Sequence, residues 1–321
     1  MSVIITGTGG ALPKKVVTND DLSKVVETTD EWIQSRTGIK QRYFKSAGET
    51  TSTLATAAAK QALEAANLTI DDIDLIIVGT ATPDLSFPSV ACQVQANLGM
   101  SHGAAFDLAA ACSGFIYALA TAESFISSGK ARKALVIGAE TFSDLITPED
   151  RTTYVLFGDG AGAVVIEKKN DESVDSAGIK AVEIFSNGDN INDLYSDGGV
   201  STTGTSGKVV MNGREVFKQA TKTLSSLVTD MLDKYNIDKD DIDWLVPHQA
   251  NKRIIDATAK HLGLDESKVI LTVAEHANTS AASIPLALDV AVRAGKIKKG
   301  DLIFLEAFGA GFTWGAALIK M

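Results

Sequence analysis

One of the two cysteines stands where a strand pattern changes into a helix pattern. Cys112 lies in Phe106-Asp-Leu-Ala-Ala-Ala-Cys-Ser-Gly-Phe115, and an apolar helical run follows over 116–126. A thiol at a helix start meets the positive end of the macrodipole, which lowers its pKa and favours the nucleophilic thiolate. We therefore predict that Cys112 is a nucleophile, although a free cysteine is also often an inert core residue. Cys92, inside an apolar helical pattern, is expected to be such a core residue.

A thiolate nucleophile usually works with partner side chains. Among the four histidines, His248 directly follows a buried strand pattern in Leu245-Val-Pro-His-Gln-Ala-Asn251, and open α/β sheets place functional groups at strand ends. His261 is expected on a solvated helix face, His102 in a loop, and His276 in a structural or supporting role. No group of residues has the spacing of metal ligands, so a zinc site is not expected.

Strand and helix patterns alternate along the whole chain, which indicates an α/β fold. Two segments are echoed at about half the chain length. Asp71-Asp-Ile-Asp-Leu75 returns as Asp240-Asp-Ile-Asp-Trp244 (240 − 71 = 169), and the turn at Gly129 returns at Gly295 (295 − 129 = 166). We therefore predict two duplicated halves, over residues 1–170 and 171–321, with the cysteine in the first and His248 in the second.

The repeat makes a further prediction about the site. The interval from Cys112 to Gly129 equals the interval from Asn278 to Gly295, since 129 − 112 = 17 and 295 − 278 = 17. Cys112 and Asn278 are therefore expected at equivalent places, each at the start of a helix. If the halves face each other across a twofold axis, these helix starts converge on one site.

Composition and charge exclude several classes of protein. The chain has 30 basic and 40 acidic residues and a net charge of −10, which disfavours nucleic-acid binding. It contains no run of 18 apolar residues and starts like a strand, so neither a membrane span nor a signal peptide is expected. Two cysteines are too few for a disulfide framework, and we expect a cytoplasmic protein. Gly7-Thr-Gly-Gly10 lacks the third glycine of a dinucleotide fingerprint.

Five motifs in this order resemble one known family. They are Asp30-Glu-Trp-Ile-Gln-Ser-Arg-Thr-Gly-Ile39, Ala111-Cys-Ser-Gly-Phe115, Val246-Pro-His-Gln-Ala-Asn251, Asn278-Thr-Ser-Ala-Ala-Ser-Ile-Pro285 and Glu306-Ala-Phe-Gly-Ala-Gly-Phe312. Over essentially its full length the chain resembles β-ketoacyl-ACP synthase III, the condensing enzyme that starts type II fatty acid synthesis. The resemblance implies the thiolase fold, five layers αβαβα built from two duplicated halves, and a homodimer.

The resemblance also implies roles for individual residues. Cys112 is the acylated nucleophile and forms a triad with His248 and Asn278, while the backbone N–H groups of Cys112 and Ala310 form an oxyanion hole. The family commonly has glycine where Ala310 stands, and alanine fits there only with a negative φ. No metal or redox cofactor is implied. Coenzyme A, as the thioester substrate, is expected to contact Thr28, Trp32, Arg36, Arg151, Gly213 and Asn251.

Two protein partners follow from the resemblance. The acyl carrier protein is expected to contact Gln249, Ala250, Asn251, Lys252 and Arg253. Because acyl carrier proteins are acidic, a local basic patch is needed, and Arg214, Lys218 and Lys222 are spaced for one helix face. Phe87 is expected to reach into the acyl pocket of a partner subunit.

The reaction implied is a decarboxylative Claisen condensation of a short acyl-CoA, expected to be acetyl-CoA, with malonyl-ACP. Three alternatives stay open: a related Cys-His-Asn condensing enzyme with another primer or acceptor, a cysteine thioester hydrolase, and a non-catalytic binding protein of the same fold. The apolar surroundings of Cys112 disfavour hydrolysis, because water must reach the acyl-enzyme. Pocket shape decides among acetyl, propionyl and branched primers, and the Gly198–Gly207 segment has no assigned role.

Overall fold

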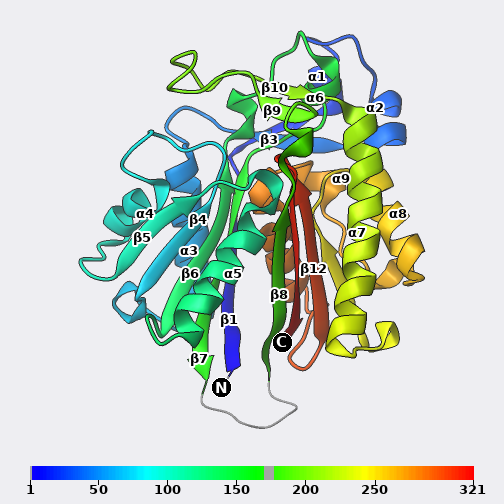
Figure 1. Ribbon diagram of the computed structural model, residues 1–321. Helices are drawn as coiled ribbons and strands as arrows, with labels where there is room; N and C mark the ends of the chain where they lie inside the picture. Colours follow the sequence, from blue (N-terminus) through cyan, green and yellow to red (C-terminus); the bar gives the residue numbers. More distant parts are fainter. Residues whose placement is uncertain (1, 170–176) are drawn as a thin grey trace.

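Two sheets form the centre of the protein in the computed structural model, which describes residues 2–169 and 177–321 (Figure 1). The first sheet has the order β1 (Ser2–Ala11), β7 (Gly160–Lys169), β6 (Lys133–Glu140), β4 (Leu75–Gly79) and β5 (Ala104–Leu108). The second has the order β8 (Gly178–Ser186), β13 (Thr313–Lys320), β12 (Leu302–Gly309) and β11 (Trp244–Pro247). Two short hairpin pairs complete the strands: β2 (Lys15–Thr18) with β3 (Gln41–Phe44), and β9 (Leu194–Ser196) with β10 (Val209–Met211).

Helices cover both faces of each sheet. The long ones are α3 (Thr51–Ala65), α4 (Val90–Leu98), α5 (Gly114–Ser127), α7 (Gly213–Tyr235), α8 (Lys252–Leu262) and α10 (Ser283–Arg293). The short ones are α1 (Asn19–Leu22), α2 (Asp30–Thr37), α6 (Arg151–Tyr154) and α9 (Val273–His276). Two 3₁₀ turns, η2 (Ala111–Ser113) and η7 (Ser280–Ala282), directly precede α5 and α10.

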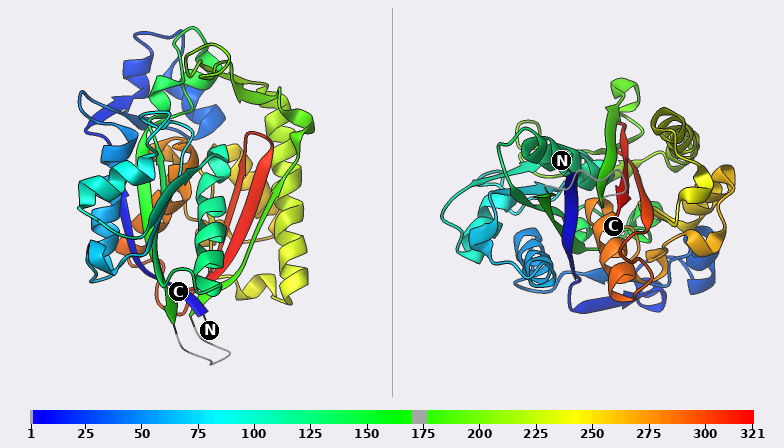
Figure 2. Two further views of the ribbon diagram at one scale, coloured as in Figure 1. Left: turned by 60° about the vertical axis from the view of Figure 1, so that its left-hand side comes forward. Right: turned by 90° about the horizontal axis from the view of Figure 1, so that it is seen from below.

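The alternation of side chains along the strands builds five layers. Successive residues of a strand point to opposite faces, so Ile76 and Val78 of β4 pack against α3 and α4, while Leu75 and Ile77 pack against α5 and α10. The same central helices contact the second sheet on its inner face. The order is therefore α3/α4, first sheet, α5/α10, second sheet, α7/α8, as the two views of Figure 2 show. This confirms the predicted five-layered fold.

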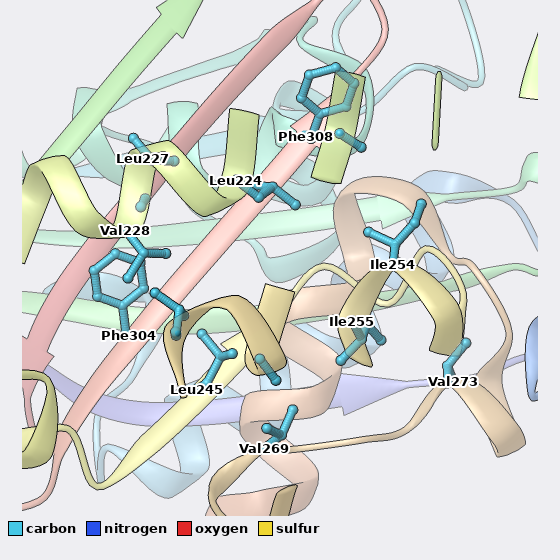
Figure 3. Packing of buried hydrophobic residues seen from close by; sticks show 14 of the residues in the cluster. Leu224, Leu227, Val228, Leu245, Ile254, Ile255, Val269, Val273, Phe304 and Phe308 are labelled. Atoms are coloured by element: carbon cyan, nitrogen blue, oxygen red, sulfur yellow. The ribbon is translucent and has the colours of Figure 1, made fainter. Parts of the chain in front are cut away.

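The outermost layer on the second sheet covers the candidate site. Leu224 and Val228 of α7 pack on Phe304 and Phe308 of β12, and Ile254 of α8 joins them (Figure 3). Leucine, valine and methionine recur at helical spacing along α7, so one apolar stripe faces the sheet and the charged residues face solvent. Burial of this stripe fixes both helices over the end of β12.

Strand order and direction confirm the duplication. The order β1-β7-β6-β4 in the first sheet corresponds to the order β8-β13-β12-β11 in the second. In both orders the first two neighbouring pairs are antiparallel and the last pair is parallel. The counterpart of β5 is reduced to a single parallel bridge between Leu245 and Val269. The predicted boundary between residues 170 and 171 lies outside the described residues.

The prediction that Cys112 and Asn278 are equivalent is wrong. The starts of corresponding strands and turns share a single offset in the numbering (244 − 75 = 169, 302 − 133 = 169, 280 − 111 = 169). The turns η2 and η7 also share a left-handed residue, Ala111 with φ 45° and Ser280 with φ 50°. The counterpart of Cys112 is thus Ala281. The smaller offset between Gly129 and Gly295 holds only at the helix ends, because α10 has 11 residues and α5 has 14.

Within the described residues, no helix is both long enough and apolar enough to cross a bilayer.

A buried carboxyl in β12 makes stability depend on pH. Glu306 is fully buried, and neither carboxyl oxygen has a hydrogen-bond partner among the described residues. Burial raises the pKa of Glu306 from 4.5 to about 8. Between these values the unfolded chain loses this proton and the folded chain keeps it, so stability falls as pH rises.

We expect Glu306→Gln to remove most of this pH dependence. Between pH 4.5 and 8 the free energy of unfolding should fall by up to about 5 kcal/mol more in the wild type than in the variant, at about 1.4 kcal/mol per pKa unit. Urea unfolding of both proteins at pH 5 and pH 8 measures it. An equal fall in the free energy of unfolding in the two proteins would show that Glu306 is not neutral in the folded state.

Candidate active site

Three elements from both halves bring the predicted triad together in one pocket. Cys112 lies in η2 after β5, His248 follows β11, and Asn278 lies between α9 and η7. All three are buried, with exposed fractions of 7%, 5% and 6%. The remaining lining is mainly apolar: Leu156, Phe157, Leu194, Met211, Val216, Ala220, Leu224, Ala250, Asn251, Ile254 and Phe308. The pocket is therefore suited to an acyl chain and keeps water from the thiol.

Two backbone features hold Cys112 in place. Ala111 adopts a left-handed conformation, which turns the chain sharply before the thiol. Gly309, at the end of β12, lies directly against this turn: a Cβ added there would be 2.8 Å from the Cys112 nitrogen and 3.0 Å from the Ser113 nitrogen. Glycine is required because any side chain would collide with the backbone that carries the thiol.

The prediction of a lowered pKa for Cys112 is wrong. Burial raises the pKa of the thiol to about 12; hydrogen bonding with Ser280 opposes this shift, and the charge of Glu140 adds to it. Desolvating a thiolate in this apolar pocket costs more than hydrogen bonding with Ser280 and with the backbone N–H of Cys112 offsets. Burial therefore favours the neutral thiol of Cys112 over the thiolate.

His248 is held as a neutral hydrogen-bond donor. Burial lowers the pKa of its imidazole to about 3. The Ser283 hydroxyl lies 2.6 Å from Nδ1 and accepts the Gln249 N–H at 3.3 Å. The hydroxyl can donate its hydrogen to Nδ1, and in that tautomer the ring proton resides on Nε2. Ser283 begins α10, and this helix therefore positions the hydroxyl that bonds the imidazole of His248.

Asn278 is oriented from behind in the same way. Its Oδ1 accepts the N–H of Ser280 at 2.8 Å. The carboxamide oxygen is thereby bonded to η7, and the NH₂ group is left to donate hydrogen bonds into the pocket. Two neutral N–H donors, from His248 and Asn278, are thus available beside Cys112.

The backbone conformation at Ala310 is one that alanine can adopt in place of the glycine that is common in the family. The described non-glycine residues with positive φ are Asn67, Ala111, Asn236, Ala277 and Ser280, and Ala310 is not among them. The requirement for a negative φ is therefore met. Neither Cys112 nor Ala310 donates its N–H to a backbone carbonyl in the described part of the chain.

An aromatic and cationic group lies at the surface around Trp32. The guanidinium groups of Arg36 and Arg151 lie 4.9 and 4.7 Å from its ring centroid, and Arg151 also donates to the Glu27 carbonyl at 2.8 Å. The hydroxyl of Thr28 is buried without a hydrogen-bond partner among the described residues. A flat ring, two cations and a free hydroxyl offer contacts for a nucleotide base and its phosphates.

Residues 249–253 divide into an inner and an outer group. Gln249 is only 1% exposed, and its amide bonds the carbonyls of Pro247 and Ile270 and the N–H groups of Thr272 and Val273. We therefore leave Gln249 out of the proposed carrier-protein surface, because its side chain is fully used in fixing the loop. Ala250 and Asn251 line the pocket, and Asn251 also caps α8.

The basic side chains predicted for carrier-protein binding lie near one another. The Arg253 guanidinium is 5.2 Å from the ring of Phe217 on α7, next to Lys218. Lys218 is 67% exposed and lies 3.5 Å from Glu215, while Lys252 is paired with Asp256 at 2.7 Å. Gly213 is the exposed first residue of α7. Arg253 and Lys218 therefore belong to one solvent-facing surface.

Phe87 lies apart from the pocket of its own chain. It belongs to the segment between β4 and α4, and its side chain is 85% exposed. Cys92 on α4 does not line the pocket, and its thiol faces the Ala105 carbonyl at 3.5 Å. Its exposure leaves the ring of Phe87 free for the contact with a partner subunit that the resemblance predicts.

Comparison with known proteins shows which family the chain resembles. Residues 106–188 match the family described as 3-oxoacyl-[acyl-carrier-protein (ACP)] synthase III, and residues 232–321 match its C-terminal counterpart. The chain is 56% identical over 318 residues to the β-ketoacyl-[acyl-carrier-protein] synthase III of Agrobacterium fabrum, covering 99% of this chain and 98% of that one. It is 57% identical to that of Novosphingobium aromaticivorans, with the same coverage.

The chain belongs to the β-ketoacyl-[acyl-carrier-protein] synthase III family. It is therefore an acyltransferase of the thiolase fold. The solved synthase III from Aquifex aeolicus superposes with a TM-score of 0.94 at 47% identity, over 99% of this chain and all of that one. A priming β-ketosynthase of the R1128 polyketide pathway gives 0.93 at 33% identity, over 99% and 96%.

Three supporting residues of this synthase III family member were missed by reasoning from the sequence. Ser283 orients His248, Ser280 orients Asn278, and Glu140 accepts the Ser280 hydroxyl at 3.0 Å. The serines lie within the motif that begins at Asn278, so their position there was an available signal. Glu140 belongs to the other half of the chain, and no local pattern links it to Ser280.

Proposed function

We propose that this protein condenses a short acyl group, carried as a coenzyme A thioester, with malonyl-ACP to give 3-ketoacyl-ACP and CO₂. This reaction starts fatty acid synthesis. The observation that carries the proposal is the joint presence of a buried thiol and two neutral N–H donors, from His248 and Asn278, in one apolar pocket. Relatives 54–57% identical to the chain carry the name of this enzyme.

In the first half-reaction Cys112 takes the acyl group. Its sulfur attacks the thioester carbonyl, and the N–H groups of Cys112 and Ala310 stabilise the negative charge that develops on the carbonyl oxygen. The bond from this carbon to the coenzyme A sulfur then breaks, and coenzyme A leaves as a thiol, so that the proton lost by Cys112 is balanced by the proton that coenzyme A takes up. Exchange between two thioesters is nearly isoenergetic, so the acyl group stays activated for carbon–carbon bond formation. Trp32, Arg36 and Arg151 are proposed to hold the adenine and phosphates of coenzyme A, together with Thr28, Gly213 and Asn251.

In the second half-reaction malonyl-ACP loses CO₂ in the same pocket. The electron pair left behind forms an enolate, whose charge collects on the thioester oxygen. We assign the stabilisation of this oxygen to Nε2–H of His248 and the NH₂ of Asn278. The enolate carbon then attacks the acyl-Cys112 carbonyl, and the thiolate of Cys112 leaves. These steps use the side chains, the N–H groups and the two thioesters alone.

The products of one incubation separate this function from the alternatives. The protein is mixed with acetyl-CoA and malonyl-ACP, and the products are read by mass spectrometry. A condensing enzyme gives 3-ketoacyl-ACP, a thioester hydrolase gives free acid, and a binding protein leaves both substrates unchanged. Repeating the incubation with propionyl-CoA and a branched acyl-CoA identifies the preferred primer, since the pocket discriminates by a few methylenes.

We also propose a homodimer in the cytoplasm. The exposed ring of Phe87 supports the dimer, because the resemblance assigns this position to the acyl pocket of the partner subunit. Strand β5 at the edge of the first sheet adds a second surface on which a copy could pair. Both cysteines are free, which fits a reducing compartment.

We expect Lys218→Glu and Arg253→Glu to weaken binding of malonyl-ACP selectively. Acyl carrier proteins are acidic, and the net charge of −10 gives no global attraction, so the local basic surface must supply it. The Michaelis constant for malonyl-ACP should rise, most at low salt, while acylation by acetyl-CoA stays nearly unchanged.

The control is Lys60→Glu, which makes the same charge change on an exposed residue of α3, on the opposite outer layer. Steady-state kinetics at 25 and 200 mM salt compare the three variants, at salt concentrations chosen to give roughly a threefold difference in Debye length. Equal losses with both substrates would place the defect in folding or in coenzyme A binding.

A further inference from the structure

Arg42, the second residue of β3, is a fully buried cation. None of the ion pairs found among the described residues includes it, and its Nε has no hydrogen-bond partner there. Burial lowers the pKa of the guanidinium from 12.5 to about 10, so the group stays charged at neutral pH. A buried charge without an acidic partner is costly to maintain, which points to a role that an apolar core residue would not fill.

The two terminal nitrogens of Arg42 connect two segments that are far apart in the sequence. Nη1 donates to Oδ1 of Asn19 at 2.8 Å and, at 3.4 Å, to the carbonyl of Val17. Nη2 donates to the carbonyl of Val155 at 3.0 Å. Asn19 begins α1, and Val155 directly follows α6. The planar guanidinium, which offers several donors in a fixed geometry, therefore joins the start of α1 to the end of α6.

Asn19 extends this connection to both ends of α2. Its Nδ2 donates to the carboxylate of Asp30 at 2.7 Å and to the carbonyl of Ile39 at 2.8 Å. Asp30 is the first residue of α2, and Ile39 follows the glycine that ends it. Because the carboxamide oxygen of Asn19 bonds Arg42 while its nitrogen bonds both ends of α2, the carboxamide is fixed in one orientation. Arg42 is thus linked to α6 directly and to α2 through one buried side chain.

The two helices that Arg42 links carry the aromatic and cationic group at the surface, and in Figure 1 both lie close to β3. Trp32 and Arg36 belong to α2, and Arg151 begins α6. The Arg151 guanidinium lies 4.7 Å from the centroid of the Trp32 ring and donates to the Glu27 carbonyl at 2.8 Å. Contacts between exposed cations and aromatic rings are individually weak. The buried bonds of the Arg42 cation are a stronger connection between the same two helices.

We propose that Arg42 is a positioning residue that holds α2 and α6 at the spacing needed to bind coenzyme A. The inference rests on the proposed function, in which Trp32, Arg36 and Arg151 hold this substrate. A site whose groups are already in place binds without first ordering two helices, whereas a looser site must lose that freedom on binding. Lysine would keep the charge of Arg42, but its single ammonium group does not reproduce the planar fork. Replacement by lysine should therefore weaken coenzyme A binding and leave Cys112 in place.

The test compares ligands with and without the nucleotide in Arg42→Lys. Titration calorimetry with coenzyme A should give a dissociation constant about tenfold above that of the wild type, as expected for the loss of one hydrogen bond from a charged group. The Michaelis constant for acylation by acetyl-CoA should rise in parallel. S-acetyl-N-acetylcysteamine carries the same acetyl thioester without adenine or phosphates, and the rate at which it acylates Cys112 should stay at the wild-type value.

Arg293→Lys is the matched control. Arg293 also joins two elements, since it bonds the Asp289 carboxylate on its own helix, α10, and the Thr8 carbonyl in β1. Its replacement should leave the affinity for coenzyme A unchanged. A double-mutant cycle with Trp32→Ala tests the route of the effect, because a residue that acts through the Trp32 ring loses its influence once that ring is removed. In the Trp32→Ala background, Arg42→Lys should therefore add little to the loss.

The proposal is overturned if a folded Arg42→Lys binds coenzyme A like the wild type, if acylation by the two thioesters falls equally, or if its loss adds fully to that of Trp32→Ala. Circular dichroism establishes folding. If Arg42→Lys does not fold, Asp30→Ala decides, because it breaks the bond from Asn19 at a half-buried position. This variant should bind coenzyme A more weakly and keep the wild-type rate with the short thioester, and an unchanged affinity overturns the proposal.

The inference and the proposed function fail in different ways. If coenzyme A binds with the expected contrast but malonyl-ACP gives no 3-ketoacyl-ACP, the proposed function fails and the role of Arg42 stands. If the product forms and Arg42→Lys shows no contrast between the two thioesters, the proposed function stands and the role of Arg42 fails. A wild type that does not bind coenzyme A overturns both.

Discussion

Incubation with acetyl-CoA is expected to add one acetyl group per chain, on Cys112 alone. Cys112 lines the apolar pocket beside His248 and Asn278, whereas the thiol of Cys92 packs on a backbone carbonyl outside it. Cys112→Ser should abolish condensation, because a serine hydroxyl in this buried site is far harder to ionise than a thiol. Peptide mass spectrometry after a short incubation locates the label.

Cys92→Ser is the control for this experiment. It removes the second thiol and should be acetylated and active like the wild type. An acetyl mass on the peptide that contains Cys92, or full activity in Cys112→Ser, would sink the assignment of the nucleophile.

The two half-reactions should separate in His248→Ala and Asn278→Ala. Both variants should still acylate Cys112, since the proposed acylation uses the Cys112 sulfur and the backbone N–H groups of Cys112 and Ala310 and includes neither side chain. Both should lose decarboxylation of malonyl-ACP by roughly two orders of magnitude or more, the usual cost of removing one donor to a developing oxyanion. Release of CO₂ from pre-acetylated protein measures the second step, and mass spectrometry measures the first.

His261→Ala is the matched control, since His261 is an exposed histidine on α8. It should leave both steps at the wild-type rate. A variant of His248 or Asn278 that decarboxylates normally yet cannot be acylated would reverse the proposed roles.

Much of the architecture could be predicted because it depends on local periodicity and on ordered motifs. Neighbouring β4 residues such as Ile76 and Ile77 point to opposite faces of the sheet, and because both are apolar they indicate that both faces are covered. The echoed Asp-Ile-Asp segments indicate the duplication from the sequence alone. Cys112, His248 and Asn278 could be predicted to share a site because each lies in a short motif at the end of an element, and they line one pocket.

The rest depends on contacts between distant segments. The misplaced equivalence of Cys112 and Asn278 arose because α10 is shorter than α5, which no turn sequence reveals. The high pKa of Cys112 follows from burial under helices of the other half. Glu140 and Ser280 meet only after both halves are folded. Local rules describe a helix start correctly and still miss the environment that the whole fold places around it.

The bonds behind His248 and Asn278 have a thermodynamic consequence. Ser283 fixes the imidazole, and the Ser280 N–H fixes the carboxamide, before any substrate arrives. The rotational entropy of these two side chains is therefore lost once, when the chain folds, and is not lost again in each catalytic cycle. Affinity for the distant coenzyme A and carrier-protein portions of the substrates is then available to drive the bond changes at Cys112.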